Sequence, residues 1–181
     1  MTIKVNIENM VSVITLNQKI DLKKFVREIR GLEYNPGRFP GVVYRIRELK
    51  LAMLIFSSGK VICTGAKSEG DIREAVKNLL KKFEEGGIRI KERPKIEIQN
   101  IVASAKMNFR VNLDRLAMEC ENTEYEPEQF PGLVFRLGDP KTVMLVFRSG
   151  KIIITGAKTS EDANRAAEKT KKIVEEINAV I

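Results

Sequence analysis

The sequence contains an internal repeat. Residues 7–83 align without a gap with residues 98–174 at a constant offset of 91, and 29 of the 77 pairs are identical. The agreement is densest where Phe39-Pro40-Gly41 matches Phe130-Pro131-Gly132. Self-similarity of this kind predicts two copies of one structural unit. We therefore expect two domains, residues 1–91 and 92–181, that form one pseudo-two-fold body.

Each copy has the same predicted order of elements, β-α-β-β-β-α, read from apolar periodicity and turn residues. Asp21 and Ser68 are expected N-caps of the two helices, and Ser57-Ser58-Gly59-Lys60 is an expected hairpin turn. In the first copy we predict a strand at 4–14, a helix at 21–30, a loop at 34–41, strands at 42–47, 51–56 and 60–64, and a helix at 68–85. The side chains predicted to face inward from the long helix are Ile72, Ala75, Val76, Leu79, Leu80 and Phe83. Two such units most simply form one antiparallel sheet with all helices on one side.

Both faces of the predicted sheet are apolar. Successive strand residues point to opposite faces of a sheet. One predicted face therefore carries Val43, Leu54 and Ile62, and the other carries Val42, Met53 and Val61. Only one face can pack against the helices. The other keeps exposed aliphatic and aromatic side chains, edged by Arg45, Ser58, Lys60 and Lys67, which is typical of a binding surface. The pattern is equally compatible with burial of this face by a second copy or another domain.

The DNA minor groove at A·T pairs fits such a surface. Its floor presents only adenine N3 and thymine O2 acceptors, without the guanine amino group. Aliphatic side chains can pack flat against this floor, and the short amides of Asn9 and Asn100 can donate to the acceptors. The cationic edge would bind phosphates.

Composition argues against several other classes of function. The net charge of +8 and the pI near 9.5 favour an acidic partner such as nucleic acid. The chain has no histidine, and its two cysteines, Cys63 and Cys120, are too few for a zinc site and are expected to be small buried residues. No apolar run is long enough to span a membrane, and the N-terminus shows no signal peptide, so we expect an intracellular protein.

Two lysine-containing segments have competing interpretations. Thr64-Gly65-Ala66-Lys67 contains glycine and lysine but lacks the spacing of a nucleotide P-loop. Lys77, Lys81 and Lys82, on the long helix, are expected to form a solvated face. The alternative is that they contact DNA outside the main site or another protein.

The sequence resembles the TATA-box-binding protein family over essentially its whole length. The strings that carry the resemblance are Phe39-Pro40-Gly41, Ile55-Phe56-Ser57-Ser58-Gly59-Lys60, Cys63-Thr64-Gly65-Ala66-Lys67-Ser68-Glu69, Tyr125-Glu126-Pro127-Glu128, Phe130-Pro131-Gly132-Leu133 and Ser149-Gly150-Lys151. The long variable extension of nuclear members is missing, so the chain is similar to archaeal members. The resemblance implies an α+β fold, in which two repeats form one curved antiparallel sheet, a saddle with helices on its convex face.

The resemblance also implies a role for individual positions. The wedges between base steps are Phe39, Phe56, Phe130 and Phe147. The residues implied to contact the minor groove are Asn9, Val11, Leu54, Ile62, Thr64, Asn100, Val102, Leu145, Ile153 and Thr155. The implied phosphate contacts are Arg45, Ser58, Lys60, Lys67, Arg136, Ser149, Lys151 and Lys158. Glu126 and Glu128 match the acidic loop that docks transcription factor B, while Gln129 replaces the leucine of nuclear members.

The implied function is that of a general transcription initiation factor. It binds and bends double-stranded A·T-rich (TATA-box) promoter DNA through the minor groove and recruits a transcription factor B homologue and RNA polymerase. We expect no catalytic activity, cofactor, metal, small-molecule substrate or membrane partner. The expected location is cytoplasmic and nucleoid-associated, in an archaeal cell without a nucleus, and a homodimer is an alternative state of the DNA-free chain.

The two copies differ in charge. Residues 1–91 hold 18 basic and 10 acidic side chains, whereas residues 92–181 hold 14 of each. The loop before Phe39 is basic and the loop before Phe130 is acidic, so the second copy is expected to recruit a basic protein partner. Two other functions compete. A single-strand RNA binder would need aromatics stacked in mid-strand, whereas Phe39 and Phe130 lie in loops. An enzyme would need a nucleophile with a base, or clustered carboxylates.

Overall fold

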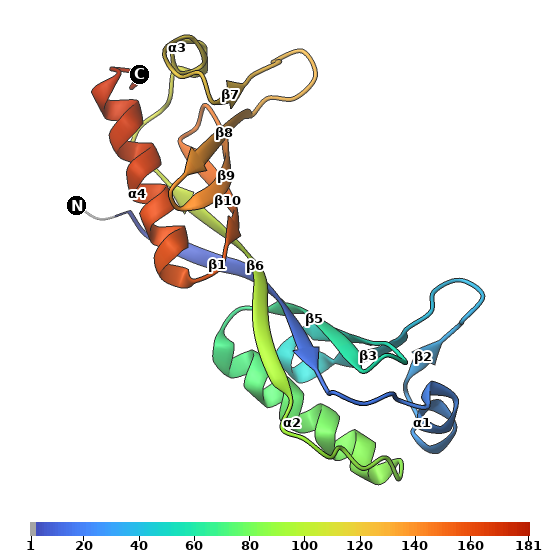
Figure 1. The fold of residues 1–181 in the computed structure, drawn as a ribbon. Coiled ribbons are helices and arrows are strands. Elements are labelled where there is room, and N and C mark those ends of the chain that lie inside the picture. Colours follow the sequence, from blue (N-terminus) through green and yellow to red (C-terminus); the bar gives the residue numbers. More distant parts are fainter. Residues whose placement is uncertain (1–2) are drawn as a thin grey trace. The chain divides into compact units, whose positions relative to one another are not determined.

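The computed structural model describes residues 3–181, which divide into two compact units. The N-terminal unit is Asn9–Gln99, and the C-terminal unit is Asn100–Ile181 together with the chain up to Glu8. These units differ from the sequence repeats because β1 (Val5–Thr15) and β6 (Lys95–Lys106) each cross a boundary between the units. Figure 1 shows the succession of elements in each unit.

The N-terminal unit follows the predicted order with two additions, β2 (Glu33–Tyr34) and the short helix η1 (Arg47–Leu49). After β1 come α1 (Leu22–Glu28), β2, β3 (Val42–Ile46), η1, β4 (Leu51–Ile55), β5 (Lys60–Ala66) and α2 (Glu69–Glu85). The turn residues of 34–41 predict a loop and give no sign of β2, whose two residues pair with Val43 and Val42. A two-residue edge strand has too little alternation to be recognised from its pattern.

The C-terminal unit repeats this order. After β6 come α3 (Leu113–Glu119), β7 (Thr123–Glu124), β8 (Leu133–Gly138), β9 (Lys141–Val146), β10 (Lys151–Ala157) and α4 (Ser160–Glu176). Hydrogen-bonded neighbours follow the order β2-β3-β4-β5-β1-β6-β10-β9-β8-β7 in a ten-stranded sheet, and the register pairs within each unit are antiparallel. The single antiparallel sheet predicted from the repeat is therefore confirmed.

Each of the four named α-helices begins at a side-chain cap, and the two predicted caps, Asp21 and Ser68, are confirmed. Asp21 accepts a hydrogen bond from the Lys24 N–H at 3.1 Å, and Ser68 accepts one from the Asp71 N–H at 3.1 Å. The second copy uses Asn112 and Thr159 in the same way. Each cap satisfies one of the N–H groups that an α-helix leaves unpaired at its N-terminus.

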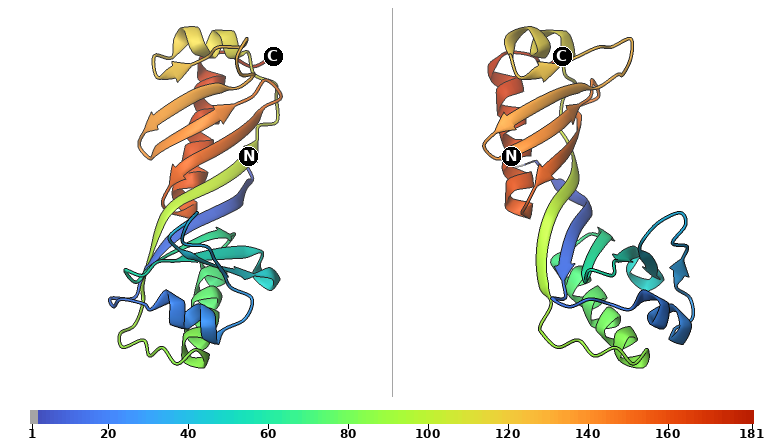
Figure 2. Two further views of the ribbon diagram at one scale, coloured as in Figure 1. Left: turned by 90° about the vertical axis from the view of Figure 1, so that its right-hand side faces the viewer. Right: turned by 45° about the vertical axis from the view of Figure 1, so that its right-hand side comes forward.

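The long helix of each unit covers one face of that unit's strands, as the two views of Figure 2 show. In α2 the buried side chains are Ile72, Ala75, Val76, Leu79 and Phe83. Phe83 packs against Phe25 of α1 with ring centroids 4.7 Å apart. Leu80 was also predicted to face inward, and that prediction is wrong because its side chain is only half-buried. Its position on the helix turns it toward the segment that follows α2.

The other face of each unit's strands is not covered by a helix, and we call it the open face. Along β4, Met53 and Ile55 are fully buried while Leu54 between them is half-exposed. The same alternation runs along β5, where Val61 and Cys63 are buried and Ile62 is half-exposed. The two parity sets predicted from the sequence therefore lie on the helix-covered and open faces.

Candidate nucleic-acid interface

The open face of the N-terminal unit carries an apolar row across four neighbouring strands. Val43 lies directly opposite Leu54, Leu54 opposite Ile62, and Ile62 opposite Val13. Residues directly opposite in an antiparallel pair share a face, so these four half-exposed side chains form one strip. Val11 is half-exposed on the same strand as Val13.

The open face of the C-terminal unit has the same row with one polar replacement. Val134, Leu145 and Ile153 are directly opposite one another on successive strands, and Ser104 follows opposite Ile153. Ser104 occupies the position of Val13, and its hydroxyl donates a hydrogen bond to Glu8 Oε1 at 2.8 Å. A carboxylate that no sequence argument selected therefore lies beside this open face.

A pair of phenylalanine rings lies at the end of β4 and again at the end of β9. Phe39 and Phe56 meet edge to face with centroids 5.6 Å apart, and Phe130 and Phe147 meet in the same way at 5.9 Å. Phe39 is 37% exposed and Phe130 is 43% exposed, which is unusual for rings of this size. The four predicted wedge residues thus lie as one pair in each unit, with one exposed and one half-buried ring.

The glycine that follows each loop phenylalanine makes room for the ring pair. A Cβ atom at Gly41 would lie 2.8 Å from Cε2 of Phe39 and 3.1 Å from Cε1 of Phe56. At Gly132 the corresponding distances to Phe130 and Phe147 are 2.7 and 3.0 Å. Both rings therefore pack against bare backbone, which explains physically why Phe-Pro-Gly recurs in the two copies.

An asparagine and a threonine are hydrogen-bonded on each open face. Asn9 Oδ1 accepts from the Gly65 N–H at 2.7 Å, and Asn9 Nδ2 donates to Thr64 Oγ1 at 3.3 Å. Asn100 makes the same two bonds with Gly156 and Thr155, at 2.7 and 3.2 Å.

These bonds set which groups the pair can offer to a ligand. The amide oxygen is occupied by backbone, while the amide nitrogen has a second hydrogen and the threonine hydroxyl has a hydrogen of its own. The pair is therefore mainly a hydrogen-bond donor. Gly65 and Gly156 have φ of +98° and +96°, a region that favours glycine, and this conformation aims their N–H groups at the asparagines.

The predicted phosphate contacts are exposed side chains in both units. They are Arg45, Ser58, Lys60, Lys67, Arg136, Ser149, Lys151 and Lys158. Arg45 is paired with Glu33 at 3.4 Å, and Arg136 is paired with Glu124 at 3.7 Å. Exposed ion pairs contribute only about 0.2–1 kcal/mol, so exchanging the glutamate for a phosphate costs little.

The predicted acidic loop lies between β7 and β8, and Glu126 and Glu128 are exposed there. Met118, which was not among the predicted site residues, is 85% exposed on α3. Thr123, the first residue of β7, donates a hydrogen bond to the Cys120 carbonyl at 2.9 Å and ties the loop to the end of the helix. The exposure of Met118 could have been predicted from the sequence, because this residue lies outside the helical spacing of the buried Leu113 and Leu116.

The two cysteines lie in different surroundings. Burial raises the pKa of the Cys63 thiol, which lies in the core as predicted, while Cys120 is only half-buried. Among residues 3–181, no three His, Cys, Asp or Glu side chains are grouped so as to hold a metal ion. No helix in the described part of the chain is long and apolar enough to cross a membrane.

Comparisons with known proteins agree with this geometry. The family model described as transcription factor TFIID (or TATA-binding protein, TBP) matches residues 4–85 and 95–177. A TATA-box-binding protein of Pyrodictium occultum is 49% identical over 175 residues, covering 97% of this chain and 88% of that protein. One from Archaeoglobus fulgidus is 50% identical over 168 residues and covers 92% of each chain.

A solved structure is also similar. The Methanococcus jannaschii TBP superposes with a TM-score of 0.88 at 47% sequence identity, covering 96% of this chain and 99% of that one. The family match includes both copies of the repeat, and therefore both phenylalanine pairs and both asparagine–threonine pairs. The chain belongs to the TATA-binding protein family of transcription factors.

Proposed function

We propose that the chain binds A·T-rich promoter DNA through the minor groove, bends it and nucleates transcription. The observation that carries this proposal is the asparagine–threonine pair beside an aliphatic row on each open face. The pair presents donors, and the floor of an A·T minor groove presents only acceptors. The aliphatic row excludes the guanine amino group, because burying that donor without a partner is unfavourable.

Bending is proposed from the phenylalanine pairs. A side chain inserted between base steps unstacks them at a cost of a few kcal/mol, which is least at flexible TA steps. The wedge role also rests on the resemblance to the TATA-box-binding protein family. In each unit an exposed ring and the half-buried ring that packs against it would supply an apolar wedge for one step.

Recruitment of a transcription factor B homologue, and through it RNA polymerase, is proposed for the acidic loop. Glu126 and Glu128 form an exposed anionic patch that suits a basic partner. Met118 on α3 has an exposed apolar side chain, and we propose that it takes the role of the leucine that Gln129 replaces. In this proposal residues 1–91 and 92–181 both contact DNA, and the acidic loop of 92–181 also contacts the protein partner. The DNA-bound chain is then associated with the nucleoid.

A second occupant of the open faces is another copy of the chain. Two apolar faces of this composition can cover each other when DNA is absent, so a homodimer is proposed as a competing state. Because the same side chains serve both partners, DNA and dimer are mutually exclusive. Light scattering with and without a duplex measures this competition directly.

Titration of three labelled probes tests the main proposal. The probes are a duplex with a TATA-like octamer, a G·C-rich duplex and a single strand of the TATA-like sequence. We expect the TATA-like duplex to bind tightest, with a bend reported by energy transfer between its ends. Equal affinity for all three probes would falsify minor-groove recognition, and tight binding of the single strand alone would indicate an RNA-type binding mode.

A further inference from the structure

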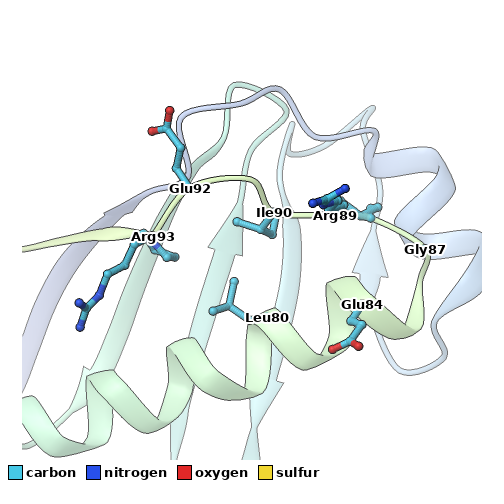
Figure 3. Close-up of a pocket in the computed structure, with 9 residues that line it drawn as sticks. Leu80, Glu84, Gly87, Arg89, Ile90, Glu92 and Arg93 are labelled. Atoms are coloured by element: carbon cyan, nitrogen blue, oxygen red, sulfur yellow. The ribbon is translucent and has the colours of Figure 1, made fainter.

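A groove of about 650 Å³ lies between the second half of α2 and the segment 86–94 that follows it. We call it the linker groove. Its apolar lining is Leu80, Ile88, Ile90 and Pro94, and its charged lining is Arg89 and Arg93 together with Glu84 and Glu92. Figure 3 shows Leu80 on the helix and Ile90 on the linker pointing toward each other across this space. The four apolar side chains are only half-buried, so the groove has uncovered apolar surface.

The wall of the groove opposite α2 is held in place by hydrogen bonds. Gln18 Nε2 donates to the Arg89 carbonyl at 2.8 Å, and the Lys91 N–H donates to Gln18 Oε1 at 2.9 Å. The Ile88 N–H donates to the Phe83 carbonyl at 2.8 Å and joins the segment to the end of α2. A groove whose walls are already ordered loses less conformational entropy when a partner binds.

The charge around the groove is positive. Residues 77–95 include seven basic and three acidic side chains. Of the acidic ones, Glu85 is paired with Lys82 at 3.5 Å, and Glu92 accepts a hydrogen bond from Asn17 at 3.0 Å. In Figure 3 Glu84 and Glu92 point away from the space between Leu80 and Ile90, as Arg93 does, so the excess of positive charge comes from the lysines around the groove. The partner should therefore be acidic.

We propose that the linker groove is a docking site for an acidic protein segment that carries apolar anchor side chains. The lining is aliphatic and offers no aromatic platform for stacking bases, which favours protein over nucleic acid. Three or four uncovered aliphatic side chains between cations suit a short segment with leucine or phenylalanine anchors among aspartates and glutamates.

This site is a property of the first copy. At the position corresponding to Leu80, the second copy has Lys171. After α4, Val180 pairs with Val111 and the Ile181 N–H donates to the Arg110 carbonyl. This segment therefore does not run back along α4 as residues 86–94 run back along α2. The groove also lies on the helix-covered side of its unit and uses none of the side chains proposed to contact DNA. It can therefore be tested independently of DNA binding.

The test uses the full chain and a fluorescein-labelled synthetic peptide built from repeats of Asp-Leu-Glu-Phe-Asp. Leu80→Asp removes an apolar contact and adds an anion, and Arg93→Glu reverses one cation. Lys172→Glu is the matched control, because it reverses a charge at the position of α4 that corresponds to Lys81. All three variants should keep the circular dichroism spectrum and the affinity for TATA-like duplex of the parent chain.

We expect each groove variant to weaken peptide binding on the order of tenfold or more, and the control to leave it unchanged. Methyl resonances of Ile88 and Ile90 should shift on titration with the peptide, and a peptide with alanine in place of its apolar residues should not bind. Equal peptide affinity across all variants would overturn the proposal. A second combination of results would also overturn it: single-stranded DNA displaces the peptide, and only Arg93→Glu loses peptide affinity. That combination would assign the groove to nucleic acid.

Discussion

The N-terminal and C-terminal units keep the same open face and differ around it. Both place a phenylalanine pair beside a glycine and an asparagine beside a threonine, with nearly equal distances. Charge, by contrast, has diverged completely, since the whole net charge of +8 lies in residues 1–91. The features that the two copies share are those proposed to contact a nearly symmetric duplex. The acidic loop and the linker groove, which differ, are proposed to contact proteins, while Glu8 beside Ser104 is a difference on the open face itself.

The largest effect should come from the wedges. Replacing Phe56 and Phe147 by Ala removes one ring from each pair and, at a few kcal/mol per wedged step, should weaken specific binding roughly a hundredfold. The bend should be lost, while non-specific binding should change little because it depends on phosphate contacts. The measurement is energy transfer across a doubly labelled duplex. If both units contribute equally, the two single variants should cause equal losses, and a bend that survives the double change contradicts the wedge assignment.

The next effect should separate the units. Glu126→Arg with Glu128→Arg reverses the acidic loop, and it should weaken recruitment of a transcription factor B homologue on the order of tenfold to a hundredfold by placing like charges together. The matched control is Asn35→Arg with Gly37→Arg, at the corresponding positions of the first copy. Binding of the duplex alone should persist in both variants. Recruitment measured by mobility shift should fall only in the first, and undiminished recruitment there would refute the loop assignment.

Much of this comparison was readable from the sequence. The repeat, the order of the principal strands and helices, and both parity sets followed from offset and alternation. The phenylalanine and asparagine roles came from resemblance. Besides β2 and η1, the surroundings of three side chains could not be predicted. Leu80 lies at the edge of the apolar stripe of α2, where helical periodicity does not distinguish a core side chain from one that lines a groove. The surroundings of Met118 and Glu8 depend on which distant segments of the chain lie near them. The pattern within one helix or one strand does not contain that information.

A smaller effect should come from Glu8, which has Gln99 as its counterpart in the repeat. Its carboxylate lies beside Ser104 on the open face and should repel DNA phosphates. Glu8→Gln should strengthen duplex binding several-fold at low salt, with the gain shrinking as salt screens the repulsion. Gln99→Glu is the reciprocal variant and should weaken binding. Isothermal titration at two salt concentrations measures both changes, and unchanged affinity in both variants would show that the carboxylate lies too far from DNA to matter.

The smallest effect should be on stability, where the cores of the two units differ. Ser12 is fully buried on the helix-covered face, and within residues 3–181 its hydroxyl has no hydrogen-bond partner beyond a weak contact with the Cys63 thiol. The second copy has Ala103 at the corresponding position, where no hydroxyl needs a partner. An unsatisfied buried hydroxyl costs about 1 kcal/mol or more, so Ser12→Ala should raise Tm by about 2–4 °C for a chain of this size.

Ala103→Ser is the reverse change in the other unit and should lower Tm by a similar amount, because it introduces the same unpaired hydroxyl into a fully buried position. Calorimetry of both variants in the same buffer compares the two cores directly. A lower Tm for Ser12→Ala would mean that the contact with Cys63 contributes more than the buried hydroxyl costs. The thiol–hydroxyl contact would then be a stabilising feature that the second copy lacks, and the two cores would differ in bonding as well as in composition.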